Sequence, residues 1–427
     1  MELKLGYKHA EDGVIPDDWD VCNLVTISSK ITDGDHVTPK RQREGDYLLS
    51  ARNIRDSHID LTDVDYVGLE EYERMRRRCA PEVGDILISC SGHGLGRVST
   101  VPEGLRCVLV RSAALVKLNP RKANSLFIQY CLQGSYAQNQ ISTSKSLAAQ
   151  PNLFINSIER LRCLLPATVS EQRAIAEALS DADALIQSLE ELIGKKRHFR
   201  QGAMQELLTG KKRLPGFSGE WRIKSLGDLF NFSGGFSASR EQLSTEGHCY
   251  LHYGDIHMSK KNFVDVRQES QDIPKLNIPL KSVSPVSLLE DGDVVFVDAS
   301  EDDEGTSKHV VVVNEGGMPF ISGLHTIVAK SKTTELEHQY RRYCFQTTAV
   351  KRQFRFFAVG TKVSGISKSN IPRITLPVPE PPEQRAIASI LSDMDGEIAA
   401  VETKLCKVRQ IKQGMMQQLL TGKVRLV

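Results

Sequence analysis

The sequence lacks the features that mark membrane, secreted and disulfide-bonded proteins. No run of about 18 apolar residues occurs that could cross a bilayer, and the opening stretch MELKLGYKHAEDG has no apolar signal-peptide core. The nine cysteines include no C-x-x-C pair. These absences predict a reduced, cytoplasmic protein with no membrane segment.

Net charge is also nearly absent. Lys and Arg number 55 against 53 Asp and Glu, so the formal charge is only +2. The chain is therefore no polycation, and an anionic partner must be met by local basic patches. Its 427 residues, 40% of them hydrophobic, leave room for two or three domains with real cores.

Familiar catalytic motifs are missing as well. There is no G-x-x-x-x-G-K-[ST] and no Asn/Asp-Pro-Pro-Tyr/Phe of the amino-methyltransferases, and GHGLG at 92–96 indicates only a glycine-rich turn. The acidic EDDE at 301–304 is typical of a solvated loop. Possible zinc ligands gather at His248, Cys249, His252 and His257. No Cys/His pair elsewhere completes a four-ligand set at familiar spacing, so we expect no metal and a non-catalytic binding protein.

What the sequence does contain is a repeat. Residues 171–214 align without gaps on 383–426, with 25 identities in 44 positions at an offset of 212. EQRAIAEALSD in the first copy aligns with EQRAIASILSD in the second, and LLTGK occurs in both copies. Two copies so far apart indicate two similar halves, each a globular segment followed by a long helix.

Both copies have a helical pattern with apolar residues spaced by four and three. Thr168 and Glu171 have capping-box spacing, Pro381-Pro382 suits a helix start, and Gly210 and Gly422 suit helix ends. Each helix would span about 38 residues, or roughly 57 Å. The first seam is Ile175, Leu179, Ala182, Ile186, Leu189 and Ile193. The second is Ile387, Leu391, Met394, Ile398, Val401, Leu405 and Val408, continuing through Ile411, Met415 and Leu419.

Seams of this length predict that the two helices pack on each other, antiparallel, as a coiled coil. The alternative is that each helix packs only on its own domain. Lys196 places a charge on the first seam where the second copy has Val408.

The segments between the helices read as mixed strands and helices. Each opens near a tryptophan, Trp19 or Trp221, and contains an apolar run, GDILIS at 84–89 or GDVVFV at 292–297. SLFIQYCLQ (125–133) and HQYRRYCFQ (338–346) indicate helices at matching places. The fold class is thus mixed α/β with pseudo-twofold symmetry. The predicted divisions are domains at 1–166 and 213–380 and helical regions at 167–212 and 381–427.

With these patterns in hand, the chain resembles the specificity subunit of Type I restriction–modification enzymes. GYKHAEDGVIPDDW (6–19) looks like the entry to the family's first recognition domain. LPATVSEQRAIAEAL and LPVPEPPEQRAIASIL look like its junctions into the two helical regions. GAMQELLTGKKRLPGF and GMMQQLLTGKVRL look like the exits. VGTKVSGISKSNIPRITLPVP (359–379) is similar to the end of a recognition domain, and TSKSLAAQPNLFINSIERLRCLLP (143–166) is a looser match.

The resemblance implies a division of labour. Each recognition domain would read one half of a split, asymmetric site in double-stranded DNA, and the helices would set the gap. Two methyltransferase subunits would dock and use S-adenosylmethionine, and two motor–endonuclease subunits would use ATP and Mg²⁺. This chain would itself hold no cofactor and have no catalytic residue.

DNA contacts are expected from polar loops that differ between the two halves and carry Arg, Lys, Asn, Gln or His. In the first half these are Arg52, Asn53, His93, Arg97, Lys145 and Gln150. In the second half they are His252, Lys260, Lys308, His309 and Lys362.

Other interpretations stay open on the residues alone. A stand-alone pseudo-symmetric DNA-binding regulator would show the same repeat. So would a methyltransferase fused to its reader, or a coiled-coil scaffold that never meets DNA.

Overall fold

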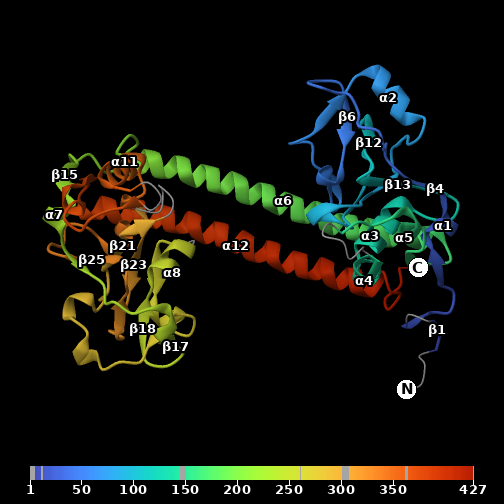
Figure 1. Ribbon diagram of the computed structural model, residues 1–427. Helices are drawn as coiled ribbons and strands as arrows, with labels where there is room; N and C mark the ends of the chain where they lie inside the picture. The colour runs from blue at the N-terminus through green and yellow to red at the C-terminus, as the bar shows by residue number, and fades with distance from the viewer. Residues whose placement is uncertain are drawn as a thin grey trace. The chain divides into compact units, whose positions relative to one another are not determined.

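Two β-rich domains and two long helices make up the computed structural model, which describes residues 5–10, 13–144, 151–259, 261–300, 307–360 and 364–426 (Figure 1). Residue contacts divide it into unit 1, residues 1–190 with 403–427, and unit 2, residues 191–402. Each unit holds one β-rich domain and a stretch of both long helices. The predicted mixed α/β class is confirmed.

The domain of unit 1 is built on two four-stranded sheets. The first consists, in spatial order, of β11 (Val98–Thr100), β10 (Ile86–Ser89), β13 (Ala113–Leu118) and β4 (Ser28–Asp33). The second consists of β12 (Cys107–Leu109), β6 (Asp46–Leu49), β9 (Asp65–Val67) and β5 (Arg41–Gln42), with β12 parallel to β6. All of β10 is buried, which explains its continuous apolar run in the sequence.

Shorter elements complete the domain of unit 1. They are β1 (Tyr7–Ala10), β2 (Gly13–Pro16), β3 (Asp20–Asn23), α1 (Leu24–Ile27), η1 (Ala51–Asn53), β7 (Ile54–Arg55), β8 (His58–Ile59), α2 (Leu69–Arg76), η2 (Gly92–Gly94), α3 (Ser125–Gln133), α4 (Ser135–Ser144), α5 (Ile155–Glu159) and β14 (Arg162–Leu165). The predicted helix at 125–133 is thus α3, and its apolar face joins Trp19 in the core.

The domain of unit 2 repeats this topology. Its first sheet consists of β16 (Phe230–Gly234), β25 (Thr326–Ser331), β21 (Val294–Val297), β23 (His309–Val313) and the extra strand β19 (Phe263–Asp265). Its second consists of β17 (Leu243–Ser244), β20 (Lys275–Leu276), β18 (His248–Leu251) and β24 (Phe320–Ser322), with β24 parallel to β18. The two halves of the chain therefore share one scaffold.

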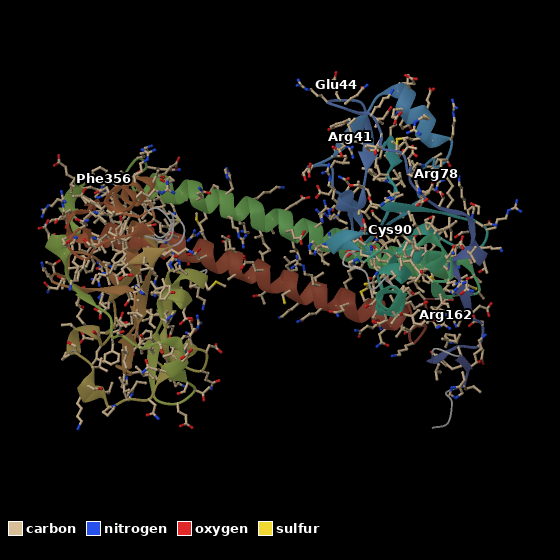
Figure 2. The ribbon with its side chains drawn as sticks, in the orientation of Figure 1. Arg41, Glu44, Arg78, Cys90, Arg162 and Phe356 are labelled. Carbon is tan, nitrogen blue, oxygen red and sulfur yellow. The ribbon has the colours of Figure 1, made fainter. Side chains whose placement is uncertain are left out.

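Further helices and strands complete the domain of unit 2. They are β15 (Arg222–Ser225), α7 (Leu226–Leu229), α8 (Tyr253–Met258), α9 (Val266–Glu269), β22 (Ala299–Ser300), α10 (His338–Cys344), α11 (Thr348–Phe357), β26 (Ser364–Gly365) and β27 (Thr375–Val378). The predicted helix at 338–346 is α10. On α11, Phe356 points outward and is 81% exposed (Figure 2).

The two long helices, α6 (Val169–Leu207) and α12 (Pro381–Leu419), have 39 residues each and pack together. The predicted start and stop signals are present. The Thr168 hydroxyl accepts a hydrogen bond from the Glu171 backbone N–H (3.2 Å), and α12 begins at Pro381. Gly210 and Gly422 both have φ of 70°, the left-handed backbone that favours glycine after a helix.

The seam residues of these helices serve two purposes. Some belong to the domain cores: Ile175, Leu179, Ile387 and Leu391. Others are buried outside those cores: Leu189, Ile193, Ile398, Leu405 and Val408. Half-buried members are Ala182, Ile186, Met394 and Val401. The start of each helix thus anchors it to the preceding domain, and the later seam faces the other helix.

Ile411 departs from the predicted seam because it is 60% exposed. Lys412 turns inward instead. Its Nζ lies 2.5 Å from Asp183 Oδ1 and 5.3 Å from the centre of the Tyr130 ring. A strict four-three alternation after Val408 falls on position 412, and lysine suits this heptad position because Asp183 and Tyr130 offer it a polar and aromatic surface.

Ion pairs between the helices repeat with the sequence offset of 212. The pairs in unit 1 are Asp183–Lys412 and Glu190–Arg409. Their counterparts in unit 2 are Asp395–Arg200 and Glu402–Arg197. These contacts run antiparallel in each unit, since lower numbers on α6 meet higher numbers on α12.

Lys196, the predicted interruption of the seam, has a partner of its own. Its Nζ lies 2.6 Å from Glu397 Oε2. The residues 212 positions away from this pair are both apolar, Val408 and Leu185. The charge on the first seam is therefore matched by an opposite charge that the other copy does not need.

The repeated Glu-Gln dipeptide fastens each helix to its domain. Gln384 is fully buried. Its side chain accepts from the Glu337 backbone N–H (2.8 Å) and donates to the carbonyls of Glu335 and Pro379 (both 2.7 Å). Gln172 makes the same three kinds of bond in unit 1. Glutamine recurs here because its amide offers a donor and an acceptor to three backbone groups.

Replacing Gln384 with alanine should destabilise the full chain by roughly 2–4 kcal/mol, because three hydrogen bonds are lost and buried backbone groups are left unpaired. Urea unfolding followed by circular dichroism measures the effect. Gln418→Ala, at an exposed position of the same helix, is the control and should change stability by less than about 0.5 kcal/mol. Equal losses for both variants would contradict a fastening role for Gln384.

The glutamate of the dipeptide holds an arginine beyond the end of the other helix. Glu383 is buried and binds Arg213 through two bonds (2.7 and 2.8 Å), and it accepts a third from Trp221 Nε1 (3.0 Å). In unit 1, Glu171 likewise binds Arg425 (2.7 Å), whose guanidinium lies over the Trp19 ring at 5.8 Å. The tryptophan that marks each half thus lies at the joint between helix and domain.

Candidate nucleic-acid interface

Loops from several strands meet at one edge of the unit 1 domain, which we call the first edge: segments 33–36, 50–56, 89–97, 110–112 and 151–153. Hydrogen bonds hold these segments together. Asp35 pairs with Val110, the Ala51 N–H donates to the Ser112 hydroxyl (3.1 Å), and the Leu153 N–H donates to the Cys90 carbonyl (2.9 Å). This edge collects chain segments far apart in sequence.

Arg52, His93 and Arg97 of the predicted contacts lie at the first edge. Arg52 is 46% exposed, and its guanidinium pairs with Asp63 (3.4 Å) and Asp65 (3.1 Å). His93 is exposed in η2, which lies against η1, and Arg97 is half-buried beside it. The structure thus brings these three residues together on one surface.

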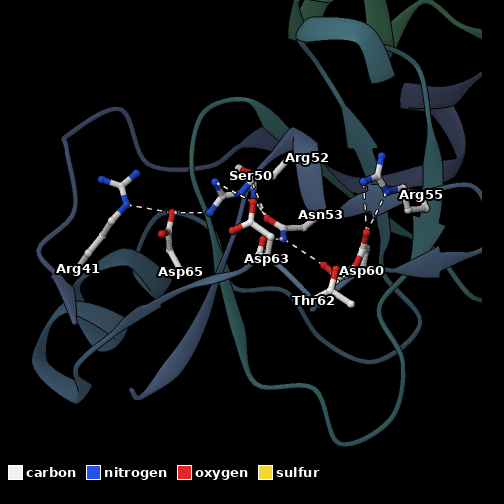
Figure 3. A network of polar contacts seen from close by, with 9 residues as sticks. All are labelled: Arg41, Ser50, Arg52, Asn53, Arg55, Asp60, Thr62, Asp63 and Asp65. Atoms are coloured by element: carbon white, nitrogen blue, oxygen red, sulfur yellow. Dashed lines mark hydrogen bonds and ion pairs between the residues drawn. The ribbon is translucent and has the colours of Figure 1, made fainter. Parts of the chain in front are cut away.

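Asn53 shapes this loop from within. It is 1% exposed, and its Oδ1 accepts from the Ser50 backbone and hydroxyl. Its Nδ2 donates to the carbonyls of Asp60 and Asp63 (Figure 3). Because both ends of the amide are committed, we leave Asn53 out of the residues proposed to touch DNA.

An acidic cluster holds the arginines of the first edge in place (Figure 3). Asp65 binds Arg52 and also Arg41, whose Nε lies 3.0 Å away. Hydrogen bonds from the Thr62 hydroxyl and backbone, together with Arg55, lower the pKa of Asp60 to about 2. Asp60 is therefore ionised at neutral pH, and it orients the guanidinium group of Arg55.

Further basic residues of unit 1 lie outside the set of predicted contacts. Arg111 is exposed directly before β13, and its backbone N–H donates to Asp35. Arg41 and Arg78 also reach the surface of unit 1 (Figure 2), and Arg78 binds Asp33 (2.7 Å). The available signal was position, since loops that follow or precede paired strands meet at one edge.

A matching edge exists in unit 2, which we call the second edge: segments 234–236, 252–258, 297–300, 322–326 and 364–366. The Gly323 N–H donates to the Leu251 carbonyl (2.9 Å), and the Asp298 N–H donates to the His325 carbonyl (3.2 Å). β22 pairs with β26, as Ser91 bridges Asn152 at the first edge. The two edges therefore occupy corresponding places on the shared scaffold.

His252 and Lys308 lie at the second edge in supporting roles. His252 is 7% exposed, and its Nδ1 accepts from the Gly254 N–H (3.1 Å) at the start of α8. Lys308 is half-buried and donates to the His257 carbonyl (2.8 Å). Both residues fix α8 to the end of the sheet.

His309 lies in the domain core instead. Its ring is 5.7 Å from Phe296 and 5.0 Å from Phe345, and burial lowers its pKa to about 4. A neutral, enclosed imidazole has no route to DNA in this conformation, so we also leave His309 out. Lys145, Gln150, Lys260 and Lys362 lie outside the described residues, as does the acidic stretch 301–304.

Residues that the sequence did not single out are the more exposed groups of the second edge. Tyr253 lies among the rings of His252, His257 and His325, with centroid distances of 4.5, 6.1 and 5.3 Å. Asp298 binds His325. The first edge is thus rich in arginine and the second in imidazole and phenol, on similar backbones.

No metal or membrane chemistry accompanies these surfaces in the described residues. Within them, no group of three or more His, Cys, Asp or Glu is arranged to hold a metal ion. The helices in the described ranges include none long and apolar enough to cross a membrane. Burial raises the pKa of the thiols of Cys79, Cys90 and Cys107 to about 12, so these are inert core residues.

In comparisons with known proteins, one family model matches both halves of the chain. The Type I restriction modification DNA specificity domain matches residues 58–195 and 218–410. Two Methanocaldococcus jannaschii proteins are similar throughout. The proposed type I restriction enzyme MjaX specificity subunit is 25% identical over 98% of this chain and 97% of its own. The MjaVIII specificity subunit is 22% identical over 96% and 94%.

Solved structures share the fold. The S subunit of a Type I restriction-modification system from M. genitalium superposes with a TM-score of 0.57 at 15% identity, covering 98% of both chains. A chain from a structure of complex assembly and conformational transition in a type I R-M system gives 0.55 at 16% identity, covering 96% of this chain and 99% of its own. At these identities the likeness concerns architecture.

Proposed function

The chain belongs to the Type I restriction–modification DNA specificity family, and from this premise we propose that it reads a bipartite, asymmetric DNA site. Specificity subunits recognise the DNA target and are not themselves catalytic. In our proposal the first edge reads one half of the site and the second edge reads the other half.

The observation that carries this proposal is the contrast between shared scaffold and different edges. Both domains have the same strand order, yet arginine dominates one edge and histidine and tyrosine the other. Direct readout depends on the donors and acceptors that side chains present to base edges. Two similar scaffolds with different edge chemistry suit two different half-sites.

We assign segments 1–166 and 213–380 as the recognition domains and 167–212 and 381–427 as the helical regions. The helices would fix the unread gap between the half-sites. Support comes from the repeated ion pairs and from the buried glutamines, which make each helix a rigid extension of its domain.

The catalytic work would belong to partners that act in the cytoplasm on double-stranded DNA. Two methyltransferase subunits would bring S-adenosylmethionine and methylate adenine N6. Two motor–endonuclease subunits would bring ATP and Mg²⁺ and cut unmethylated DNA. The structural relative from a type I R-M complex supports assembly of this kind.

Single-molecule methylome sequencing of cells with and without this gene tests the proposal. We expect a bipartite N6-methyladenine motif, two short specific parts around an unread spacer, that disappears on deletion. A methylome that is unchanged by deletion, or a continuous motif, would refute the reading of two separate half-sites.

Arg52→Ala should weaken DNA binding alike for all sequences if its contact is to phosphate, and should reduce the salt slope of log K by about one. Binding of the assembled methyltransferase complex is measured by fluorescence anisotropy across salt concentrations. Arg106→Ala is the control, because Arg106 is 64% exposed but precedes β12, away from the first edge. A slope unchanged in Arg52→Ala, or lowered equally in both, would remove Arg52 from the interface.

A further inference from the structure

His325 of the second edge has an unusual backbone. Its φ is 58°, and among the described residues only Ser57 is another non-glycine with positive φ. The left-handed region is strained for most side chains, and strained residues gather at functional sites. His325 lies between β24 and β25 with its side chain 49% exposed, so the strain presents an imidazole to solvent.

Two neighbours hold that imidazole in one orientation. Nδ1 lies 3.2 Å from Asp298 Oδ1, and the Asp298 backbone N–H donates to the His325 carbonyl, so side chain and backbone are joined to the same residue. The Tyr253 ring stands edge-on to the imidazole, at an interplanar angle of 83°. The ring is therefore fixed from two sides, while 49% of the side chain remains exposed.

Stability does not account for this arrangement. An ion pair between half-exposed groups contributes little, and a half-exposed ring buries little apolar surface. Glycine at this position would adopt the same backbone without strain. The arrangement is better explained by what it displays.

We propose, resting on the proposed function, that His325 is a specificity-determining residue that reads a base edge in the half-site of unit 2. Asp298 is its positioning residue. In the tautomer whose proton is on Nδ1 and directed at the Asp298 carboxylate, Nε2 is a hydrogen-bond acceptor. The matching donors in the major groove are the amino groups of adenine N6 and cytosine N4.

The same place in unit 1 supports this assignment. β13 begins at Ala113 as β25 begins at Thr326, so Arg111 and Ser112 stand where Leu324 and His325 stand in unit 2. At this turn the first edge exposes Arg111, which aligns with Leu324, whereas the second edge exposes His325, which aligns with Ser112. A guanidinium donates, whereas Nε2 of the Nδ1-protonated tautomer accepts, so the two edges would select different bases at this turn.

His325→Gly tests the proposal in the assembled methyltransferase complex. Rates are measured on the cognate site and on sites with single base changes. We expect discrimination to fall by about 10- to 100-fold at one adenine or cytosine position of one half-site, with the other half unaffected. The midpoint temperature of thermal unfolding should be unchanged or higher, because glycine adopts this backbone conformation without strain. Asp298→Asn should relax the same position by a smaller factor.

His338→Ala is the matched control. His338 also pairs with an aspartate, Asp291, at 3.2 Å and is 51% exposed, but it begins α10 away from the second edge. It should leave both half-sites unchanged. Unaltered discrimination in His325→Gly overturns the proposal. A uniform loss at every position with a lower salt slope also overturns it, since that marks a phosphate contact. A wild-type complex without a bipartite motif would instead refute the proposed function.

Discussion

Replacing residues 222–380 with the matching segment of another specificity subunit should change one half of the methylated motif completely and leave the other half intact. The cut points suit such an exchange because β15 and β27 pair, with Arg222 opposite Val378. The inserted domain would therefore enter and leave through adjacent strands. Methylome sequencing of cells that carry the hybrid measures the outcome.

The reciprocal exchange of residues 20–165 is the control. Its ends also lie on paired strands, Asp20 opposite Leu165 in β3 and β14. It should alter the other half of the motif. If either hybrid changed both halves, or neither, the half-sites would not belong to separate domains and the modular reading would fail.

The architecture could be predicted because the determining signals are local or repeated. The helix starts at Thr168 and Pro381 follow from short-range capping chemistry, and the glycines at 210 and 422 mark the ends. The apolar runs at β10 and β21 indicate buried strands without any tertiary information. The 212-residue offset then implies that both halves fold alike.

The edge residues were harder to predict because burial is a tertiary property. Asn53 and His309 are polar residues in polar-looking stretches, but a turn closes over one and two phenylalanines enclose the other. Arg111 and His325 stand out only once strand ends are brought together. No local sequence pattern predicts that His325 will adopt a left-handed backbone conformation.

The helices illustrate the same limit. The choice of apolar residues placed Ile411 on the seam, yet Lys412 faces inward because it meets Asp183 and Tyr130. Lys196 was predicted to interrupt the seam, yet it forms an ion pair with Glu397 of the other helix. Periodicity gives the face of a helix, whereas the partner surface decides which side chains suit each place.

A fragment of about residues 216–427 should form a tighter homodimer than one of about residues 1–215, by roughly tenfold in Kd, or about 1.4 kcal/mol. Because the ion pairs repeat with the sequence offset, each homodimer can form an equivalent pair between its two copies. This pair is Asp395 with Lys412 in the 216–427 dimer and Asp183 with Arg200 in the 1–215 dimer. The difference lies at Lys196, which loses Glu397 when two copies of α6 pair. Sedimentation equilibrium measures both constants.

In the homodimer of the 216–427 fragment, Glu397 also loses its partner. Its side chain is 64% exposed, so water can solvate the carboxylate at little cost in free energy. Lys196 is 31% exposed and lies on the seam, so its charge must leave water or splay aside. Lys196→Val should therefore tighten the 1–215 dimer, whereas Lys195→Val, at an exposed neighbour, should not. A 1–215 dimer that is already the tighter one, or whose Kd is unchanged by Lys196→Val, would show that this lysine does not limit pairing.

Either dimer that assembles with methyltransferase subunits should methylate a symmetric site, one half-site and its inverted copy, because it carries two identical edges.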